Sequence, residues 1–296
     1  LLQQQSSNRT GVTSGDYLGK QLEFANGSTG VVVAHRPPLI FCYSTNDDDD
    51  DDDDVDALEG TVKIQSNLVH LAVSPTVRVT DCMGRDLASS GDEPDLSTDR
   101  RAIFASIPKV SDIALINHPV LTGITMVDAL APIGRGQNML FIGHDIASLR
   151  DYVETILQTQ HSQTQCVYAC TDNKAQKDLL QRFRDAGLND VHFVGTQSSD
   201  EDDPVSKSAE AVAIASAACS IAELYARRGQ HTLVVVDTLD LHKQFWDATT
   251  RVLIDVFGAE AVVRSDREGG ASSEMRGFFS SLVQRSAQYN AKLGGG

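Results

Sequence analysis

The sequence of 296 residues predicts an α/β protein in which a small all-β unit precedes a mostly parallel sheet with helices on both faces. Three observations predict this class. Short β-like runs broken by turns fill residues 16–87. After an acidic, Ser-rich stretch, apolar strand-like runs alternate with helical stretches. The hydrophobic content of 41% is enough for one large or two modest cores.

The first part of the chain reads as a polar tail followed by a β domain. Residues 1–15 are rich in Gln, Ser and Thr, and we expect them to be disordered. Within residues 16–90, two apolar runs flank Asn26-Gly27, a strong hairpin signal, and further alternating runs predict a small barrel or sandwich. The acidic insert 46–59 contains eight consecutive aspartates, which repel one another and predict a solvated loop.

The second part of the chain predicts the parallel sheet. After a linker placed at 91–110, four apolar runs predict buried parallel strands: NMLFIG, QCVYAC, VHFVGT and HTLVVVD. Three helical stretches lie between them. They cover 147–158, the run KAQKDLLQRFRDAG, and an Ala- and Ser-rich stretch from a capping Asp203 to a terminating Gly229.

Charge and composition disfavour several classes of partner. The formal net charge is -16 at pH 7, and Asp47 to Asp54 supply eight of the negative charges. Nucleic acid and anionic membrane surfaces are polyanions, so neither is expected as the main partner. No apolar stretch approaches the roughly 20 residues of a membrane span, so direct membrane insertion is not expected. Five scattered cysteines predict free buried thiols rather than disulfides or a zinc site.

The stretch PIGRGQNMLFIGHDIASLR, from Pro132 to Arg150, has the order of a phosphate-binding loop: a strand, Gly143 and a helix. Such a loop needs a second glycine, a lysine for the phosphates and a hydroxyl for magnesium. Counting from Gly143 puts Leu149 at the lysine and Arg150 at the hydroxyl, whereas counting back from the helix puts Ser148 at the lysine. Either register removes the lysine, and one lost charge-assisted contact weakens binding roughly ten- to a hundredfold. Arg150 could instead grasp a phosphate from a different angle.

Carboxylates surround this loop. Asp145 and Asp151 place negative charge near the phosphates that such a loop would hold, an unfavourable pairing. Asp237 ends the run HTLVVVD, and the carboxyl end of a parallel strand faces the ligand in folds of this class. A strand-end cap or turn former is the alternative interpretation of Asp237.

Five collinear segments resemble the alpha subunit of the F-type ATP synthase: LEFANGSTGVVV, HPVLTGITMVDALAPIGRGQNMLFIG, QCVYACTDNK, ELYARRGQHTLVVVDTLDLHKQ and SLVQRSAQYNAKLGGG. The similarity spans residues 16–296. It implies an N-terminal β-barrel followed by a RecA-like domain, of the phosphate-loop NTPase type, at 111–296, incomplete at its C-terminus. It also implies a place in, or descent from, a hexameric ring of alternating alpha-like and beta-like chains.

The resemblance also implies roles for single residues. Asp237 matches the carboxylate that orients magnesium-bound water in the family. Asn173, in TDNK, falls where catalytic beta-like chains carry a glutamate base and alpha-like chains carry an amide. An amide cannot take a proton from water. Gly143, Ser148, Arg150, Asn173 and Asp237 then mark a vestigial nucleotide site, with no catalytic residue and no metal ligand among them.

These expectations favour a non-catalytic alpha-like protein without a cofactor. It would act as a structural, accessory or assembly component of an organellar complex, first of all the proton-transporting ATP synthase, through contacts with beta-like or other subunits. A nucleotide-binding regulatory alpha-type subunit that holds ATP and magnesium is the alternative. The acidic charge and the missing lysine speak against an independent enzyme or nucleic-acid motor. The resemblance suggests the mitochondrion or chloroplast, on the soluble face of an inner-membrane complex.

Overall fold

The computed structural model describes residues 2–3, 17–45, 62–87, 99–197, 203–237, 239–262 and 270–296. The acidic insert 46–59 lies outside these residues, as does most of the tail 1–15. Leu2–Gln3 form strand β1, which pairs with β4, so this small part of the tail that was predicted to be disordered is ordered.

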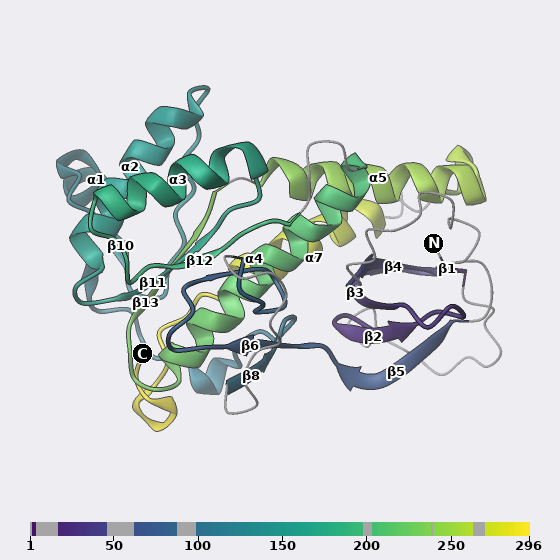
Figure 1. Ribbon diagram of the computed structural model, residues 1–296, viewed down its shortest axis with the longest axis horizontal. Coiled ribbons are helices and arrows are strands. Elements are labelled where there is room, and N and C mark those ends of the chain that lie inside the picture. The colour runs from purple at the N-terminus through teal and green to yellow at the C-terminus, as the bar shows by residue number, and fades with distance from the viewer. Residues whose placement is uncertain are drawn as a thin grey trace.

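The N-terminal strands form a five-stranded antiparallel sheet in the order β1-β4-β3-β2-β5 (Figure 1). Besides β1, its strands are β2 Lys20–Glu23, β3 Thr29–Arg36, β4 Leu39–Ser44 and β5 Lys63–Leu68. The predicted hairpin is confirmed, because β2 and β3 pair antiparallel across a turn in which Gly27 has a φ of 87°. Only glycine adopts that value without strain. Of the predicted small barrel or sandwich, the described residues form this one antiparallel sheet, with β1 and β5 at its edges.

Strands from the predicted β domain and linker reach beyond this sheet. β6 His70–Val73 pairs antiparallel with β8 Asp99–Ala102, which lies inside the stretch predicted as a linker. β7 Val79–Thr80 pairs parallel with β12 and so joins the second sheet. The N-terminal segment therefore contributes to both sheets.

The second sheet is parallel and has the order β13-β11-β12-β7. Three of the four predicted parallel strands are confirmed as β11 Gln165–Ala169, β12 His192–Val194 and β13 Thr232–Val236. Successive side chains of β11 point to opposite faces. Cys166 and Tyr168 pack with Leu157 of α2 (Ile146–Gln160) and Phe183 of α3 (Asn173–Asp185). The other face of β11 packs against α4.

Helix α4, Pro204–Ala226, is the centre of the core. The Asp203 side chain accepts hydrogen bonds from the N–H groups of Val205 and Ser206, and Gly229 beyond the helix end has a φ of 85°. The predicted cap and stop are therefore confirmed. Its small residues allow close approach, and one hydrophobic cluster joins α4 to the parallel sheet and to β3 and β6. Figure 1 shows α4 crossing between the two sheets.

One helix contradicts the expectation that no stretch of the chain is apolar enough to span a membrane. Pro204–Ala226 is long and apolar enough by length and composition, but 89% of its most apolar window is buried inside the protein. Helix α4 is apolar on all sides because two sheets enclose it.

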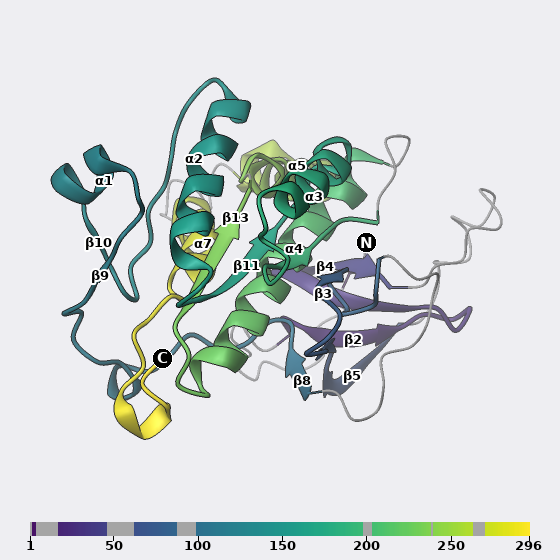
Figure 2. The same ribbon diagram turned by 60° about the vertical axis from the view of Figure 1, so that its left-hand side comes forward.

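The predicted strand NMLFIG is absent from the structure. Residues 135–145 form no strand, and Leu140 and Ile142 are 68% and 85% exposed. The preceding β10 (Ile133–Gly134) pairs with β9 (Pro119–Val120) across α1 (Thr125–Leu130), and Asn138 Nδ2 donates to the Val283 carbonyl oxygen at 2.9 Å. These anchors hold the segment off the sheet, as Figure 2 shows for β9, β10 and α1.

The remaining described elements complete the molecule. They are α5 Asp240–Phe257, α7 Gly270–Val283, and the short 3₁₀ turns η2 Val110–Asp112 and η3 Ala291–Leu293. All five cysteines are free thiols, and Cys82, Cys166 and Cys170 are buried.

Candidate functional site

The first turn of α2 binds a carboxylate of its own chain. Asp145 caps the helix, accepting from Ala147 N–H at 3.1 Å and from the Ser148 hydroxyl at 2.7 Å. These hydrogen bonds, first of all the one from the Ser148 side chain, lower the pKa of Asp145. A helix N-terminus favours one bound anion. Here Asp145 is that anion, at the place where a phosphate-binding loop would hold its ligand.

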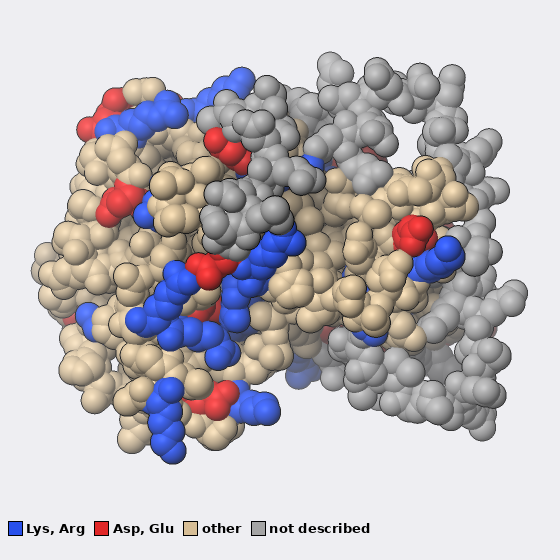
Figure 3. All heavy atoms as spheres, turned by 60° about the horizontal axis from the view of Figure 1, so that its bottom comes forward, with Lys and Arg blue, Asp and Glu red and all other residues tan. Residues whose placement is uncertain are grey.

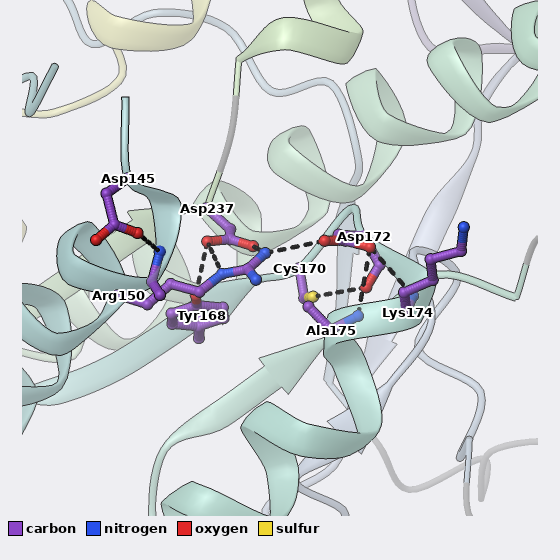
Figure 4. A network of polar contacts seen from close by, with 9 residues as sticks. Asp145, Arg150, Tyr168, Cys170, Asp172, Lys174, Ala175 and Asp237 are labelled. Atoms are coloured by element: carbon purple, nitrogen blue, oxygen red, sulfur yellow. Dashed lines mark hydrogen bonds and ion pairs between the residues drawn. The ribbon is translucent and has the colours of Figure 1, made fainter. Parts of the chain in front are cut away.

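Arg150, one turn further along α2, reaches the end of β13. Its Nε donates to Asp237 Oδ1 at 3.1 Å and its Nη2 donates to Asp237 Oδ2 at 2.6 Å. The two hydrogen bonds form a bidentate ion pair (Figure 4). The Tyr168 hydroxyl donates to the same carboxylate at 2.9 Å. The Asp237 side chain is only 3% exposed, so its charge depends on these donors. The position predicted for a magnesium-orienting carboxylate is thus occupied by an internal ion pair.

A second carboxylate completes the cluster. Asp172 caps α3, accepting from Lys174 N–H at 3.1 Å and Ala175 N–H at 3.3 Å, and its other oxygen receives Arg150 Nη2 at 3.1 Å. β11 and β13 are neighbours, so Asp172 and Asp237 follow adjacent strand ends, and Figure 4 shows the guanidinium between them. One cation therefore bridges two carboxylates.

The surroundings in this cluster shift the pKa values of Arg150, Tyr168 and Cys170. The hydrogen bond to Asp237 is the main cause that raises the pKa of Arg150, against an opposing effect of partial burial. Burial, and then the charge of Asp237, raises the pKa of Tyr168, while burial raises the pKa of Cys170 to about 12. At neutral pH the phenol and the thiol stay protonated, so neither is an activated nucleophile.

A cavity of about 1120 Å³ opens beside this cluster. It lies along the edge of β13, whose five residues are all partly exposed, and the unpaired segment Met139–Gly143 forms another of its walls. β13 is the last strand of the described sheet on that side. The cavity therefore lies between the unpaired edge of β13 and the segment that was predicted to form a further parallel strand.

Four of the five residues predicted as a vestigial site line this cavity: Gly143, Arg150, Asn173 and Asp237. Ser148 is not among its lining residues and donates to Asp145. Asn173 is the first residue of α3, directly after its cap.

The sequence interpretation missed Asp172 and Tyr168. Asp172 had a usable signal, because an aspartate directly after a predicted strand and before a helical run is a typical helix cap. The hydrogen bond from Tyr168 had no signal, since an alternating strand pattern says which face a side chain occupies and not which partner it meets.

A magnesium nucleotide does not fit this arrangement of side chains. The Asp237 carboxylate that would orient its water accepts three internal hydrogen bonds, and Asp145 fills the helix terminus. Lys174 and Lys207 line the cavity, but neither belongs to the loop at Gly143. Within the described ranges, no three His, Cys, Asp or Glu side chains come together as metal ligands would.

The chain is similar to known proteins over most of its length. The nucleotide-binding domain of the ATP synthase alpha/beta family matches residues 123–253. ATP synthase subunit alpha 2 of Gluconobacter oxydans is 30% identical over 291 residues, which cover 94% of this chain and 52% of that protein. ATP synthase subunit alpha of Acetivibrio thermocellus is 29% identical over 286 residues, with the same coverage. That of Dehalococcoides mccartyi is 31% identical over 229 residues, or 74% of this chain and 41% of the relative. The chain spans about half the length of the curated relatives it matches.

Proposed function

The chain belongs to the ATP synthase alpha/beta family, with an alpha-like sequence, and on this premise we propose that it is a non-catalytic alpha-like component of a multiprotein complex. Its role would be structural, accessory or assembly-related, and it would act through protein surfaces. The proton-transporting ATP synthase of an organelle is the complex we favour, with a beta-like chain as the neighbour.

One observation carries this proposal: the Arg150 guanidinium occupies the space between Asp237 and Asp172. For Asp237 to orient the water of a bound magnesium nucleotide, the bidentate ion pair between Arg150 and Asp237, with hydrogen bonds of 3.1 and 2.6 Å, would have to break. Hydrogen bonds to charged groups contribute about 1.5–3 kcal/mol each, and about 1.4 kcal/mol corresponds to a tenfold change in affinity. Breaking the pair without replacing it therefore lowers nucleotide affinity by at least tenfold.

The neighbouring groups support the same conclusion. Asp145 occupies the α2 terminus, so an incoming phosphate would have to displace a like-charged group from it. By the family resemblance, Asn173 falls where catalytic beta-like chains carry a glutamate base, and its amide cannot accept a proton from an attacking water. Nucleotide hydrolysis by this chain is disfavoured at both steps.

Exposed apolar side chains support a function through protein contacts. Val110 and Leu115 are each 90% exposed, and Leu130 is 75% exposed, all in the segment that leads to β10. Apolar groups gathered on one stretch of surface are typical of protein–protein contact sites. A mitochondrial or plastid location, on the soluble face of an inner-membrane complex, completes the proposal and follows from the resemblance alone.

Calorimetric titration with ATP, with and without magnesium, tests the nucleotide half of the proposal. We expect no heat of binding at millimolar ATP. Micromolar affinity that Asp237→Ala abolishes would contradict the proposal. Purification of the chain from its native source tests the other half, with a beta-like ATP synthase chain expected to copurify. A solitary monomer would count against it.

A second candidate is a nucleotide-binding regulatory subunit. The cavity of about 1120 Å³ favours it, because the site is large enough for a nucleotide and its wall includes the hydroxyl-bearing Thr171. The Thr171 Oγ1 atom is buried and makes no hydrogen bond in the described structure. The same titration separates the two candidates, because only a regulatory subunit would bind ATP without any mutation of the chain.

A further inference from the structure

Cationic side chains gather on the face of the molecule where the parallel strands begin, at the opposite end of β13 from Asp237. We call this surface the basic face. Figure 3 shows Lys and Arg in a band across it, with fewer Asp and Glu between them. Its members come from β8, the loops before η2 and after β10, the end of α4, and η3: Arg100, Arg101, Lys109, Arg135, Arg227, Arg228 and Lys292.

Contacts between side chains and between backbone groups join these segments into one surface. An ion pair between Arg228 and Asp99 ties the end of α4 to β8. The Arg227 guanidinium lies 5.2 Å from the centre of the Tyr289 ring, next to η3. The backbone N–H of Asn290 donates to the Asp112 carbonyl oxygen at 2.9 Å, which brings η3 to η2. Segments separated by more than a hundred residues in sequence thus meet here.

Most of these cations keep a free charge. Arg228 pairs with Asp99, and Arg101 lies 3.6 Å from Glu223, a carboxylate already bound by Arg285 at 2.7 Å. The other five, Arg100, Lys109, Arg135, Arg227 and Lys292, make no ion pair within the part of the chain that the structure describes. The basic face therefore carries an excess of positive charge on a chain whose net charge is -16.

The local electrostatics agree with this excess. Burial is the first cause that lowers the pKa of His231, and its electrostatic interaction with the nearby Arg135 guanidinium lowers it further. The C-terminal dipole of α4 accounts for two of the cations, Arg227 and Arg228. It does not account for those on β8, in the loops or on η3, which lie on other elements.

We infer that the basic face binds a short acidic peptide segment of a partner protein. Five of its seven cations are arginines, and a planar guanidinium can form bidentate hydrogen bonds with a carboxylate. Screening over about 8 Å at physiological salt limits the attraction to charges directly over the face. A long polyanion such as duplex nucleic acid, or a flat anionic membrane, would extend beyond the basic face and be repelled by the acidic remainder of the chain. A short acidic segment avoids that repulsion. This inference goes beyond the proposed function, since it concerns the end of the sheet remote from Asp237.

The test uses the full chain and a fluorescent peptide of sequence TNDDDDDDDDVD, with TNNNNNNNNNVD as its uncharged counterpart. The aspartates of the chain itself, Asp47 to Asp54, are replaced by asparagine so that they do not compete. A face variant carries Arg100→Gln, Lys109→Gln, Arg227→Gln and Lys292→Gln. A matched control loses four exposed cations elsewhere, through Lys63→Gln, Lys177→Gln, Arg184→Gln and Arg251→Gln. Circular dichroism establishes that both variants fold.

We expect fluorescence anisotropy to show binding of the acidic peptide, at least tenfold weaker in the face variant and within twofold of the parent in the control. The uncharged peptide should not bind, and affinity should fall between 50 and 300 mM salt. Equal losses in the face and control variants would overturn the inference, as would no binding by the folded parent chain. Tighter binding of a 12-base-pair DNA duplex or of phosphatidylglycerol vesicles would overturn it as well. Because ATP plays no part in this assay, its outcome is independent of the proposed function.

Discussion

Arg150 shows how one side chain changes the chemistry available at a strand end. Its guanidinium contacts Asp237 and Asp172, both at distances of 3.1 Å or less. A lysine on a comparable stem is a single point charge and cannot match the planar carboxylate with two parallel hydrogen bonds. The sequence also allowed Arg150 to bind a phosphate. In that case its guanidinium would have to break its contacts with both carboxylates.

Replacing Arg150 together with Ser148 and Leu149 is therefore expected to raise the affinity of the chain for nucleotide. The triple change Ser148→Gly, Leu149→Lys and Arg150→Thr supplies the missing glycine, lysine and hydroxyl and frees Asp237. Calorimetry with magnesium and ATP should then detect tighter binding than in the parent chain. The double change Ser148→Gly and Leu149→Lys is the matched control, because it retains Arg150. Equal affinity in the double and triple variants would show that Arg150 does not block the site.

Two buried histidines make the stability depend on pH. His192 and His242 are almost fully buried, and burial lowers the pKa of each to about 4; nearby Arg78 also lowers that of His192. The unfolded chain, with a histidine pKa near 6.5, binds more protons between these values, so stability rises with pH across this window. We expect the free energy of unfolding to fall as pH drops from about 6.5 to about 4, by roughly 3 kcal/mol for each histidine.

Urea unfolding at several pH values measures this dependence. His192→Asn should reduce the slope between pH 4 and 6.5, since the variant has one proton fewer to take up on unfolding. The exposed His144→Gln is the control and should leave the slope unchanged. A stability that stays constant over this range in the parent chain would contradict the burial of both rings in solution.

Among the elements, α4 depends most on a buried ionic network. Arg285 follows α7 and is 6% exposed; its Nε donates to Glu223 Oε1 at 2.7 Å and its Nη2 to the Ser220 hydroxyl at 2.7 Å. Its Nη1 donates to the carbonyl oxygens of Ser216 and Ile103. One side chain therefore ties α7, α4 and the strand end after β8 together.

Removing one partner of this network is expected to lower the free energy of unfolding strongly. Arg285→Met leaves the buried Glu223 carboxylate with only the longer 3.6 Å contact from Arg101, and removing one partner of a buried ion pair costs about 3–5 kcal/mol. The double change Arg285→Met and Glu223→Leu removes both charges, and we expect it to recover at least half of the loss, because apolar groups of similar volume replace a buried pair with little penalty. Denaturant midpoints of the two variants provide the measurement. A double variant as unstable as the single one would mean that the carbonyl and hydroxyl contacts dominate.

At the scale of the whole molecule, the two sheets share one core. A single hydrophobic cluster contains Val31 and Val33 of the N-terminal sheet, Val167 of the parallel sheet and Ala213 of α4. Arg36 strengthens the connection, since its Nη1 donates to Thr249 and Thr250 of α5 at 2.8 Å and its guanidinium stacks 3.8 Å from the Trp246 ring. One face of each sheet packs into this cluster with α4, and Phe41 of the N-terminal sheet contacts Phe245 of α5.

We therefore expect the chain to unfold in one cooperative transition. Trp246 is the single tryptophan, so its fluorescence reports on α5 beside the N-terminal sheet, whereas far-ultraviolet circular dichroism reports mainly on the helices of the parallel-sheet region. The two curves should coincide in urea. Separate midpoints would show two units that fold independently, as the predicted division into a β domain and a nucleotide-binding domain implies.

Local sequence signals predicted much of this fold. The periodicity of QCVYAC, VHFVGT and HTLVVVD identified three strands of the parallel sheet, because an apolar run of strand length depends only on its own residues. The cap Asp203 and the stop Gly229 delimited α4 for the same reason. The pairing Asn26-Gly27 predicted the β2–β3 hairpin.

What the sequence determined by itself is the class of the fold, the family resemblance, and the absence of a lysine and a second glycine from the loop after Gly143. Only the tertiary structure decided where Arg150 points, since its partner Asp237 lies 87 residues away and no local pattern couples them. It also decided that β7 joins the parallel sheet while Met139–Ile142 stays off it, because strand pairing depends on anchors elsewhere in the chain. Periodicity is a property of neighbouring residues, whereas the filling of a site results from contacts between distant ones.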